Sequence, residues 1–583
     1  MWFLAYFILH LAVYSSLRLQ FLWWNWDSLS SSETAELLWA LFYGLRFDLS
    51  VLAYTLGLAV LGLFWLPARW SLNKIYFWLF AALNSALIIV NFIDAELINF
   101  TAKRFSSATL YLVGEGGVSN LLLPYIPLVM VSVFIFSIYA YVLYRLSLSA
   151  KLRPPGGLFK KISLSVALLA VAVVMARGGL QLKPLTYVDA KLFNSTYANN
   201  LVLNSSFTFL KSLGKPSLER KKYFPSGELL GFLNEQSLAK VQLNLPRHPN
   251  VVLLILESFS SEYTELRNPE VTPFLNSLAR KSVSFKEAYA NGRRSIEGVA
   301  ALLSGIPALM EEPFISSEFS ANQLIGLGTL LESQGYHTSF FHGTKNGSMH
   351  FDRFTKSVGI TNYFGLSEYP ETGHYDGTWG IFDEEFLNWS CKKMSAFPQP
   401  FFSSVFTLSS HQPFKIPERY EARFADQRHE ILKSVRYADH ALQEFFRCAE
   451  QQSWFGQTVF ILTADHTGPA LKPVTEFAQN YRVPLVIYSP IPGLGVDSSV
   501  DQNQLAQHID VLPTVLDLLN IEYKNKNYLA RSLLRTGPKL IALYGDHQYQ
   551  LLGDITDNDL QLKAVQQYFS EGLYDNRLYY PAK

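Results

Sequence analysis

Four side chains with the chemistry to act on a phosphate ester occur at three places in the sequence. Glu257 follows the apolar run 251–256, Asp465 and His466 lie just after the run 458–463, and Ser295 lies between these two places. Carboxylate oxygens, a hydroxyl and an imidazole form a donor set that suits a divalent ion such as Mn²⁺, Mg²⁺ or Zn²⁺. Because metal coordination can activate a serine hydroxyl, the set predicts a site in which Ser295 is both a ligand and the nucleophile.

Each of these residues also has a simpler interpretation. Buried strands often end in polar turn residues, so Asp465-His466 fits a turn as well as a metal site. Ser295 follows a turn at Asn291-Gly292 and precedes an apolar stretch, 296–303, that predicts a short helix. A helix N-terminus favours an anion, which suits attack on a phosphate ester. An N-cap serine, with Glu297 in the first turn, is nevertheless what the local pattern alone favours.

Three continuous apolar runs predict buried parallel strands that would bring these residues together. The runs cover 251–256, 401–408 and 458–463, and the second ends at Ser409-Ser410-His411. Helical patterns lie between them, for instance at 273–281 and 431–452. We therefore predict an α/β domain, mostly parallel sheet with helices on both faces, whose ligands lie at the carboxyl ends of the strands.

The first third of the chain is of a different kind. Only 18 of the first 176 residues are charged, against 79 of the 407 that follow. About 20 apolar residues span a bilayer as a helix, and five stretches approach that length. They are 2–24, 46–66, 75–93, 121–144 and 162–175.

Basic residues in the loops predict the orientation of these spans. The loops after the second and fourth spans hold Arg69 and Lys74, and then Arg145, Lys151, Arg153, Lys160 and Lys161. The loop after the third span holds only Lys103 and Arg104. Because cytoplasmic loops carry the excess of Lys and Arg, we expect a cytoplasmic N-terminus and everything after the fifth span outside.

The sequence therefore divides into three predicted parts: a five-helix transmembrane domain over 1–176, a juxtamembrane linker over 177–245 and an extracytoplasmic catalytic domain over 246–583. Thr196–Leu213 within the linker fits an amphipathic helix near the membrane. Arg46, Asp48, Asp94 and Glu96 lie near the ends of spans, which favours interfacial anchoring or pairing over a role in function.

Composition excludes several other classes of protein. A net charge of +1 gives no reason to expect nucleic acid as a partner. Two cysteines, Cys391 and Cys448, exclude a disulfide scaffold and a Cys-rich metal site, although the two could pair outside the cytoplasm. The oligomeric state is left open.

Several motifs together resemble the lipoteichoic acid synthase family, within the alkaline phosphatase and sulfatase superfamily. The resemblance covers the spans, the linker and the catalytic domain. Its motifs are Leu254-Ile255-Leu256-Glu257-Ser258-Phe259, Thr272-Pro273-Phe274-Leu275, Gly292-Arg293-Arg294-Ser295, Leu408-Ser409-Ser410-His411-Gln412-Pro413-Phe414, Thr463-Ala464-Asp465-His466 and the stretch 508–519. Trp379-Gly380 and Asp383-Glu384 resemble a further family segment to which we assign no role at this point.

The resemblance implies that Glu257, Ser295, Asp465 and His466 hold one Mn²⁺-type ion, with Ser295 as nucleophile where the family commonly has threonine. His411 would contact the substrate phosphate. Arg353 matches the arginine of a Trp-x-Arg headgroup contact, whereas Phe351 replaces its tryptophan.

The activity implied is transfer of a phosphoglycerol headgroup from phosphatidylglycerol to an acceptor hydroxyl on a glycan or glycolipid. The enzyme would be a multi-pass protein of a bacterial cytoplasmic (inner) membrane, and the departures from the family pattern favour a Gram-negative envelope.

Three alternatives remain at this point. A phosphoethanolamine transferase has sister chemistry, although such enzymes often carry several disulfides. A sulfatase or phosphodiesterase is less favoured, because the formylglycine pattern of x-Pro-x-Arg does not follow Ser295. A non-enzymatic lipid-binding relative would be expected to have lost a ligand, and all four ligand types are present.

Overall fold

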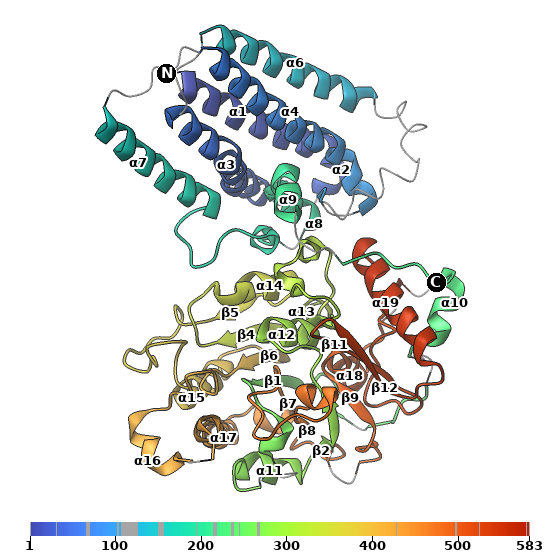
Figure 1. The fold of residues 1–583 in the computed structure, drawn as a ribbon. Coiled ribbons are helices and arrows are strands. Elements are labelled where there is room, and N and C mark those ends of the chain that lie inside the picture. The colour runs from blue at the N-terminus through green and yellow to red at the C-terminus, as the bar shows by residue number, and fades with distance from the viewer. Residues whose placement is uncertain are drawn as a thin grey trace. The chain divides into compact units, whose positions relative to one another are not determined.

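The protein folds into two compact units in a computed structural model (Figure 1). Unit 1 comprises Met1–Ser217 and Ser316–Gln323, and unit 2 comprises Leu218–Ile315 and Leu324–Lys583. The structure describes residues 2–30, 32–65, 70–101, 104–106, 126–149, 157–193, 195–213, 218–234, 238–243, 245–264, 269–426, 428–495, 498–523, 525–578 and 580–581. The predicted linker is therefore divided between the two units.

Unit 1 is built from long apolar helices. They are α1 (Trp2–Trp24), α3 (Thr34–Trp65), α4 (Trp70–Thr101), α6 (Ile126–Ser149) and α7 (Leu158–Arg177), with the short helices α2 (Trp26–Leu29), α8 (Thr196–Val202) and α9 (Ser205–Ser212). Within the described residues, three segments are long and apolar enough to cross a membrane: Thr34–Thr55, Ile126–Leu146 and Leu158–Arg177. Many large apolar side chains of α6 and α7 are exposed, as expected of surfaces that face lipid.

Helix α3 differs from the predicted second span, because it begins twelve residues before Arg46. The stretch ahead of Arg46 is rich in Ala and Leu, which favour helix, and so extends the element. Arg46 and Asp48 therefore lie inside a helix, as do Asp94 and Glu96 in α4. Leu66, residues 121–125 of the fourth stretch, and the loop residues Arg69, Lys103, Lys151 and Arg153 lie outside the described residues.

The expected amphipathic helix at 196–213 is instead two short helices, α8 and α9, that are buried in unit 1. The turn between them, at Asn204 and Ser205, contacts two buried carboxylates from different long helices. Asn204 Nδ2 donates to Asp48 Oδ1 at 2.6 Å, and Ser205 Oγ donates to Asp94 Oδ2 at 2.5 Å. Both carboxylates are fully buried, so their pairing in unit 1 is structural.

Two arginines complete this polar cluster. Arg18 lies 2.6 Å from Asp48 and donates to the carbonyl oxygens of Leu201, Val202 and Leu203 at the end of α8. Arg104 lies 2.7 Å from Asp94. A cation at the carboxyl end of a helix is favourable, and a buried charge is tolerated only when it is paired in this way.

Unit 2 contains a seven-stranded sheet in the order β2-β8-β7-β1-β6-β4-β5. Its strands are β1 (Asn250–Leu256), β2 (Val283–Phe285), β4 (His337–His342), β5 (Asn362–Phe364), β6 (Phe401–Phe406), β7 (Thr458–Ala464) and β8 (Leu485–Tyr488). Strands β7, β1, β6, β4 and β5 run parallel, and β8 and β2 join antiparallel at one edge. The three predicted strands are thus adjacent, in the middle of the sheet, and the predicted fold class is confirmed.

Helices cover both faces of this sheet. In Figure 1, α12, α13 and α14 lie on one side and α15 and α17 on the other. The helices are α10 (Ser226–Leu229), α11 (Pro273–Ala279), α12 (Ser295–Ser304), α13 (Leu327–Glu332), α14 (Phe351–Ser357), α15 (Asp383–Met394), α16 (Glu421–Phe424), α17 (Glu430–Ala449), α18 (Val511–Leu518) and α19 (Asn558–Tyr574). Small two-stranded pairs accompany them: β3 (Glu287–Tyr289) with β9 (Leu505–Gln507), β11 (Leu540–Gly545) with β12 (Gln548–Gly553), and β10 (Asn525–Lys526) with β13 (Tyr580–Pro581).

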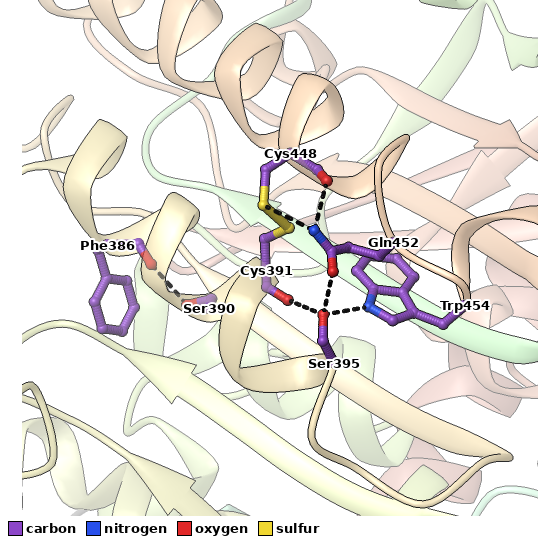
Figure 2. Close-up of a disulfide and its surroundings, with 7 residues drawn as sticks. All are labelled: Phe386, Ser390, Cys391, Ser395, Cys448, Gln452 and Trp454. Atoms are coloured by element: carbon purple, nitrogen blue, oxygen red, sulfur yellow. Dashed lines mark hydrogen bonds between the residues drawn. A yellow bond between two sulfur atoms is a disulfide. The ribbon is translucent and has the colours of Figure 1, made fainter.

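A disulfide joins α15 to α17 on one face of the sheet. Cys391 and Cys448 are bonded, and Figure 2 shows the surrounding hydrogen bonds to Ser395, which accepts from the indole of Trp454 at 3.0 Å. Apolar residues of α17 recur at intervals of three and four, as in Ile431, Val435 and Ala438, so one stripe of the helix packs into the core.

Candidate metal and nucleophile site

The carboxyl ends of β1 and β7 place three potential metal ligands side by side. These strands pair in parallel, so Glu257 and Asp465 emerge at the same edge of the sheet. One ligand atom from each of Glu257, Asp465 and His466 lies within 4.8 Å of the others. The structure therefore brings together residues that are more than 200 positions apart in the sequence.

Hydrogen bonds to the backbone occupy one ligand atom on both Asp465 and His466 and leave the other for the site. Asp465 Oδ1 accepts from the backbone N–H of Ser258 and of His466, each at 2.8 Å. Its buried Oδ2 has no hydrogen-bond donor in the part of the chain that the structure describes. His466 Nδ1 lies 2.8 Å from the Thr467 carbonyl, which can only accept, so Nδ1 carries the proton. Imidazole ligands are typically oriented in this way, with the lone pair on Nε2.

Two buried carboxyl groups in this position favour a compensating cation. Glu257 and Asp465 are almost completely buried, at 1% and 0% exposure. Burial, together with the neighbouring charge of Asp465, raises the pKa of Glu257 well above its ordinary value. Oxygen and imidazole donors, an unpartnered carboxylate oxygen and adjacent buried negative charges all fit a divalent ion.

Ser295 completes the set as the first residue of α12. Its Oγ lies 3.4 Å from Glu257 Oε2 and 3.3 Å from His466 Nε2. The interpretation of Ser295 as an N-cap is wrong, because the cap position belongs to Arg294 and the serine hydroxyl faces the ligands. Glu297 instead holds the preceding turn, with Oε2 accepting from the backbone N–H of Arg293 and Arg294.

Gly298 allows α12 to approach this closely. A Cβ atom at position 298 would lie 2.0 Å from the backbone oxygen of Asp465, far below any contact distance. The helix that carries Ser295 is therefore packed directly against the strand end that carries Asp465 and His466. Nothing in the sequence near Gly298 marks this contact, because it depends on a residue 167 positions away.

A cavity of about 600 Å³ opens beside this site. Glu257, His466, Arg293 and His411 line it, and the segment 467–482 forms part of its wall with Lys472 and Arg482. The sequence did not identify this wall, because its charged residues are separated by turns and form no motif.

The remaining predicted contacts have different positions. His411 follows β6 and lines the cavity, as expected from its place at a strand end. Arg353 lies on α14, with Nε 3.6 Å from Asp352 Oδ2, and is not among the described residues that line the cavity. Phe351 is fully buried and packs against His342 and Phe406.

The sheet order and this site define an alkaline phosphatase-like domain. Residues 249–521 match the sulfatase family and form a sulfatase-family domain. Two solved structures share the fold. A protein of the alkaline phosphatase superfamily from Vibrio parahaemolyticus has a TM-score of 0.53 at 22% identity and covers 62% of this chain and 99% of its own. The lipoteichoic acid synthase LtaP from Listeria monocytogenes has a TM-score of 0.52 at 15% identity, covering 62% and 100%.

Sequence relatives are more specific, and they bear the name of the family predicted by resemblance. A lipoteichoic acid synthase-like protein of Bacillus subtilis (strain 168) is 28% identical over 317 residues, which cover 50% of this chain and 51% of the relative. Lipoteichoic acid synthase 1 of the same organism is 28% identical over 300 residues, covering 47% and 46%. The chain thus spans about half the length of the curated relatives it matches.

Proposed function

We propose that this protein is a membrane-anchored, metal-dependent transferase that moves a phosphoglycerol headgroup from phosphatidylglycerol to an acceptor hydroxyl. The observation that carries the proposal is the position of Ser295. Its hydroxyl lies within 3.4 Å of Glu257 and His466 at the start of a helix, and both of these neighbours line the cavity. The similarity to lipoteichoic acid synthases favours phosphoglycerol as the transferred group.

In the first step, Ser295 Oγ attacks the phosphorus of the donor lipid. The new Oγ–P bond replaces the bond between phosphorus and the diacylglycerol oxygen, and diacylglycerol leaves with a proton. The dipole of α12, with its positive end at Ser295, favours the negative charge of the phosphate. His411, on the cavity wall, is proposed to contact a phosphate oxygen.

In the second step, the acceptor hydroxyl attacks the phosphorus held on Ser295. The acceptor oxygen forms the new bond to phosphorus, the Oγ–P bond breaks, and Ser295 regains its proton. This double displacement predicts ping-pong kinetics. The acceptor is a glycan or glycolipid hydroxyl in this proposal, since the relatives are named for a glycolipid polymer.

Glu257, Ser295, Asp465 and His466 would hold the divalent ion, most favourably Mn²⁺, with Mg²⁺ and Zn²⁺ as alternatives. When bound there, such an ion lowers the pKa of the serine hydroxyl and neutralises phosphate charge. The chain's own residues supply the nucleophile, the orientation of the ligands and the cavity that admits the lipid headgroup.

We further propose that the protein is a multi-pass protein of the bacterial inner membrane, with a cytoplasmic N-terminus and unit 2 outside the cytoplasm. The disulfide between Cys391 and Cys448 supports this orientation, because disulfides persist in oxidising compartments and are rare in the cytoplasm. A transferase anchored beside its donor lipid meets that substrate at the membrane surface.

The proposal is tested by incubating the purified full-length protein and Mn²⁺ with radiolabelled phosphatidylglycerol or phosphatidylethanolamine in separate vesicles. We expect the wild-type protein to release diacylglycerol from phosphatidylglycerol and the Ser295→Ala variant to release none. Release from phosphatidylethanolamine alone would reassign the headgroup, and release at the wild-type rate by Ser295→Ala would contradict the covalent mechanism.

A further inference from the structure

We infer that Trp379 and Asp383 are positioning residues that hold His411 at the wall of the catalytic cavity. The expected effect on turnover rests on the proposed function. The positioning of His411 rests on geometry alone. It gives a role to the Trp379-Gly380 and Asp383-Glu384 segment, for which the sequence motif offered none.

Trp379 contacts both the ring and the backbone of the His411 turn. The two ring centroids are 3.9 Å apart. The indole Nε1 donates to the carbonyl oxygen of Gln412 at 2.6 Å, and His411 Nδ1 lies 2.9 Å from the same oxygen. Because a carbonyl can only accept, His411 Nδ1 carries the proton, and Nε2 is left without a hydrogen bond in the described chain.

The loop that carries Trp379 is itself well ordered by hydrogen bonds. Asp376 Oδ1 accepts from three successive backbone N–H groups, those of Thr378, Trp379 and Gly380, at 2.7–3.1 Å. Lys415 Nζ donates to Asp376 O at 3.1 Å and to Thr378 Oγ1 at 3.0 Å. The indole of Trp379 is therefore held in place before substrate binds, and it supports the imidazole of His411 in the orientation seen in the structure.

Asp383 holds the backbone on the other side of His411. It is buried at the first position of α15, and its Oδ1 accepts from the N–H of Leu408 and of Ser409 at 2.8 and 3.1 Å. Ser409 Oγ in turn accepts from the Asp383 N–H at 3.1 Å. These three hydrogen bonds between Asp383 and the pair Leu408 and Ser409 thus fix the chain between the end of β6 and His411.

The same segment also contacts the neighbourhood of the metal ligands. Thr407 Oγ1 accepts from the backbone N–H of Glu257 at 2.9 Å. Residues 407–411 therefore run from the Glu257 strand end to His411, and Asp383 holds their middle. Fixing this segment fixes the position of the imidazole relative to the nucleophile site, on which the transfer geometry depends.

A double-mutant cycle on diacylglycerol release from phosphatidylglycerol tests the role in turnover. We expect Trp379→Ala to lower kcat/KM about 10- to 100-fold, the usual effect of losing a group that orients an active residue. Trp379→Phe, which keeps a ring against His411, should restore most of the activity. If Trp379 acts through His411, the double variant Trp379→Ala/His411→Ala will be no slower than His411→Ala alone.

The comparison variant is Tyr375→Phe, which removes one hydrogen bond to the Thr378 carbonyl in the same loop without touching His411 and should lower kcat/KM far less than Trp379→Ala. Asp383→Asn should retain more activity than Asp383→Ala, since one carbonyl oxygen can still accept from Leu408 and Ser409. Multiplicative losses in the double variant, or a wild-type rate for Trp379→Ala, would overturn the inference.

A second measurement needs no substrate. Diethylpyrocarbonate modification of His411, followed by peptide mass spectrometry in the full-length protein, should be several-fold faster in Trp379→Ala than in the wild type. Equal rates would overturn the positioning of His411 by Trp379. If the wild type released diacylglycerol from neither lipid, the proposed function would be wrong. The modification rates would still test whether Trp379 positions His411.

Discussion

At the scale of single residues, the site is defined by which ligand atoms the backbone leaves free. Asp465 uses Oδ1 to accept two backbone N–H groups and leaves Oδ2 without a donor in the described chain. His466 uses Nδ1 in the same way and leaves Nε2 beside the Ser295 hydroxyl. Metal binding should therefore depend on Asp465 Oδ2 and His466 Nε2, which make no hydrogen bond to the backbone.

The first prediction is that Asp465→Asn weakens Mn²⁺ binding more than about 100-fold, since even outer contacts to a ligand are worth about 10- to 100-fold. Isothermal titration of the full-length protein in detergent measures this. The matched control is Asp439→Asn, which alters a buried carboxylate that caps α11 and does not line the cavity. Mn²⁺ affinity unchanged in Asp465→Asn would remove this residue from the ligand set.

A second prediction concerns His342, which is buried at the end of β4 against Phe406. Burial lowers the pKa of His342 to about 3. The folded protein then binds fewer protons than the unfolded chain between pH 3 and 6.5, so stability rises with pH there and is lost as pH falls. This group alone should cost about 2 kcal/mol between pH 6.5 and 5.

Chemical denaturation of the wild type and His342→Phe across this pH range checks the slope. The variant should lose stability less steeply on acidification. Phe406→Leu, which alters the stacked neighbour, should destabilise equally at every pH. A slope in His342→Phe identical to that of the wild type would refute this assignment.

At the scale of secondary structure, the site depends on how closely α12 packs against the end of β7. Gly298 makes that approach possible, because any Cβ would collide with the Asp465 carbonyl. Ser295 lies one turn before this contact. The distance between nucleophile and ligands is thus set by a helix-to-strand contact rather than by Ser295 itself.

We therefore predict that Gly298→Ala displaces α12, lowers the rate of diacylglycerol release about 100-fold and destabilises unit 2 by about 1–3 kcal/mol. Gly456→Ala is the matched control, since a Cβ at position 456 has no atom within 4 Å and should leave activity and stability unchanged. The rate of diacylglycerol release and the thermal unfolding of both variants test this prediction. Normal turnover in Gly298→Ala would show that the helix can move without consequence.

The disulfide between α15 and α17 carries another prediction at this scale (Figure 2). Replacing Cys391 and Cys448 together by Ala should lower the free energy of unfolding by about 2–4 kcal/mol. In cells, a maleimide reagent should fail to label either thiol unless a reductant is added first. Labelling without reductant would argue that unit 2 lies in a reducing compartment.

How much of this could be predicted from the sequence differs between elements. The three central strands were predictable because continuous apolar runs end in polar residues, and parallel pairing then brings Glu257 and Asp465 together. The start of α3 was not predicted, because the second span was placed from apolar residues alone and the polar run Ser30-Ser31-Ser32-Glu33 ahead of Thr34 was not used as a helix start signal. The helices α8 and α9 were misjudged, because their burial depends on Asn204 and Ser205 meeting carboxylates more than 100 residues away.

Within the site, residue type and position predicted the ligand set, whereas orientation could not be predicted. The local pattern favoured Ser295 as a cap, and only the three-dimensional contact with His466 shows where its hydroxyl points. Asp383 belongs to a segment that resembles the family, but its role could not be predicted, since its partners are backbone N–H groups of a distant loop.

At the scale of the whole molecule, the chain combines apolar helices with a sulfatase-family domain. The charge-poor unit 1 contains a buried polar cluster, in which Asp48 and Asp94 hold the turn between α8 and α9 to the long helices. The charge-rich unit 2 holds the proposed chemistry. This division suits an enzyme whose donor is a membrane lipid and whose reacting group is a single phosphate.

The central claim is that Ser295 carries the phosphoglycerol group during turnover. The most direct measurement stops the full-length enzyme with acid during reaction with Mn²⁺ and phosphatidylglycerol, and then analyses its peptides by mass spectrometry. The proposal predicts a glycerophosphoryl adduct on the peptide that contains Ser295, absent from Ser295→Ala. Diacylglycerol release with no adduct in the wild type, and undiminished release by Ser295→Ala, would contradict it.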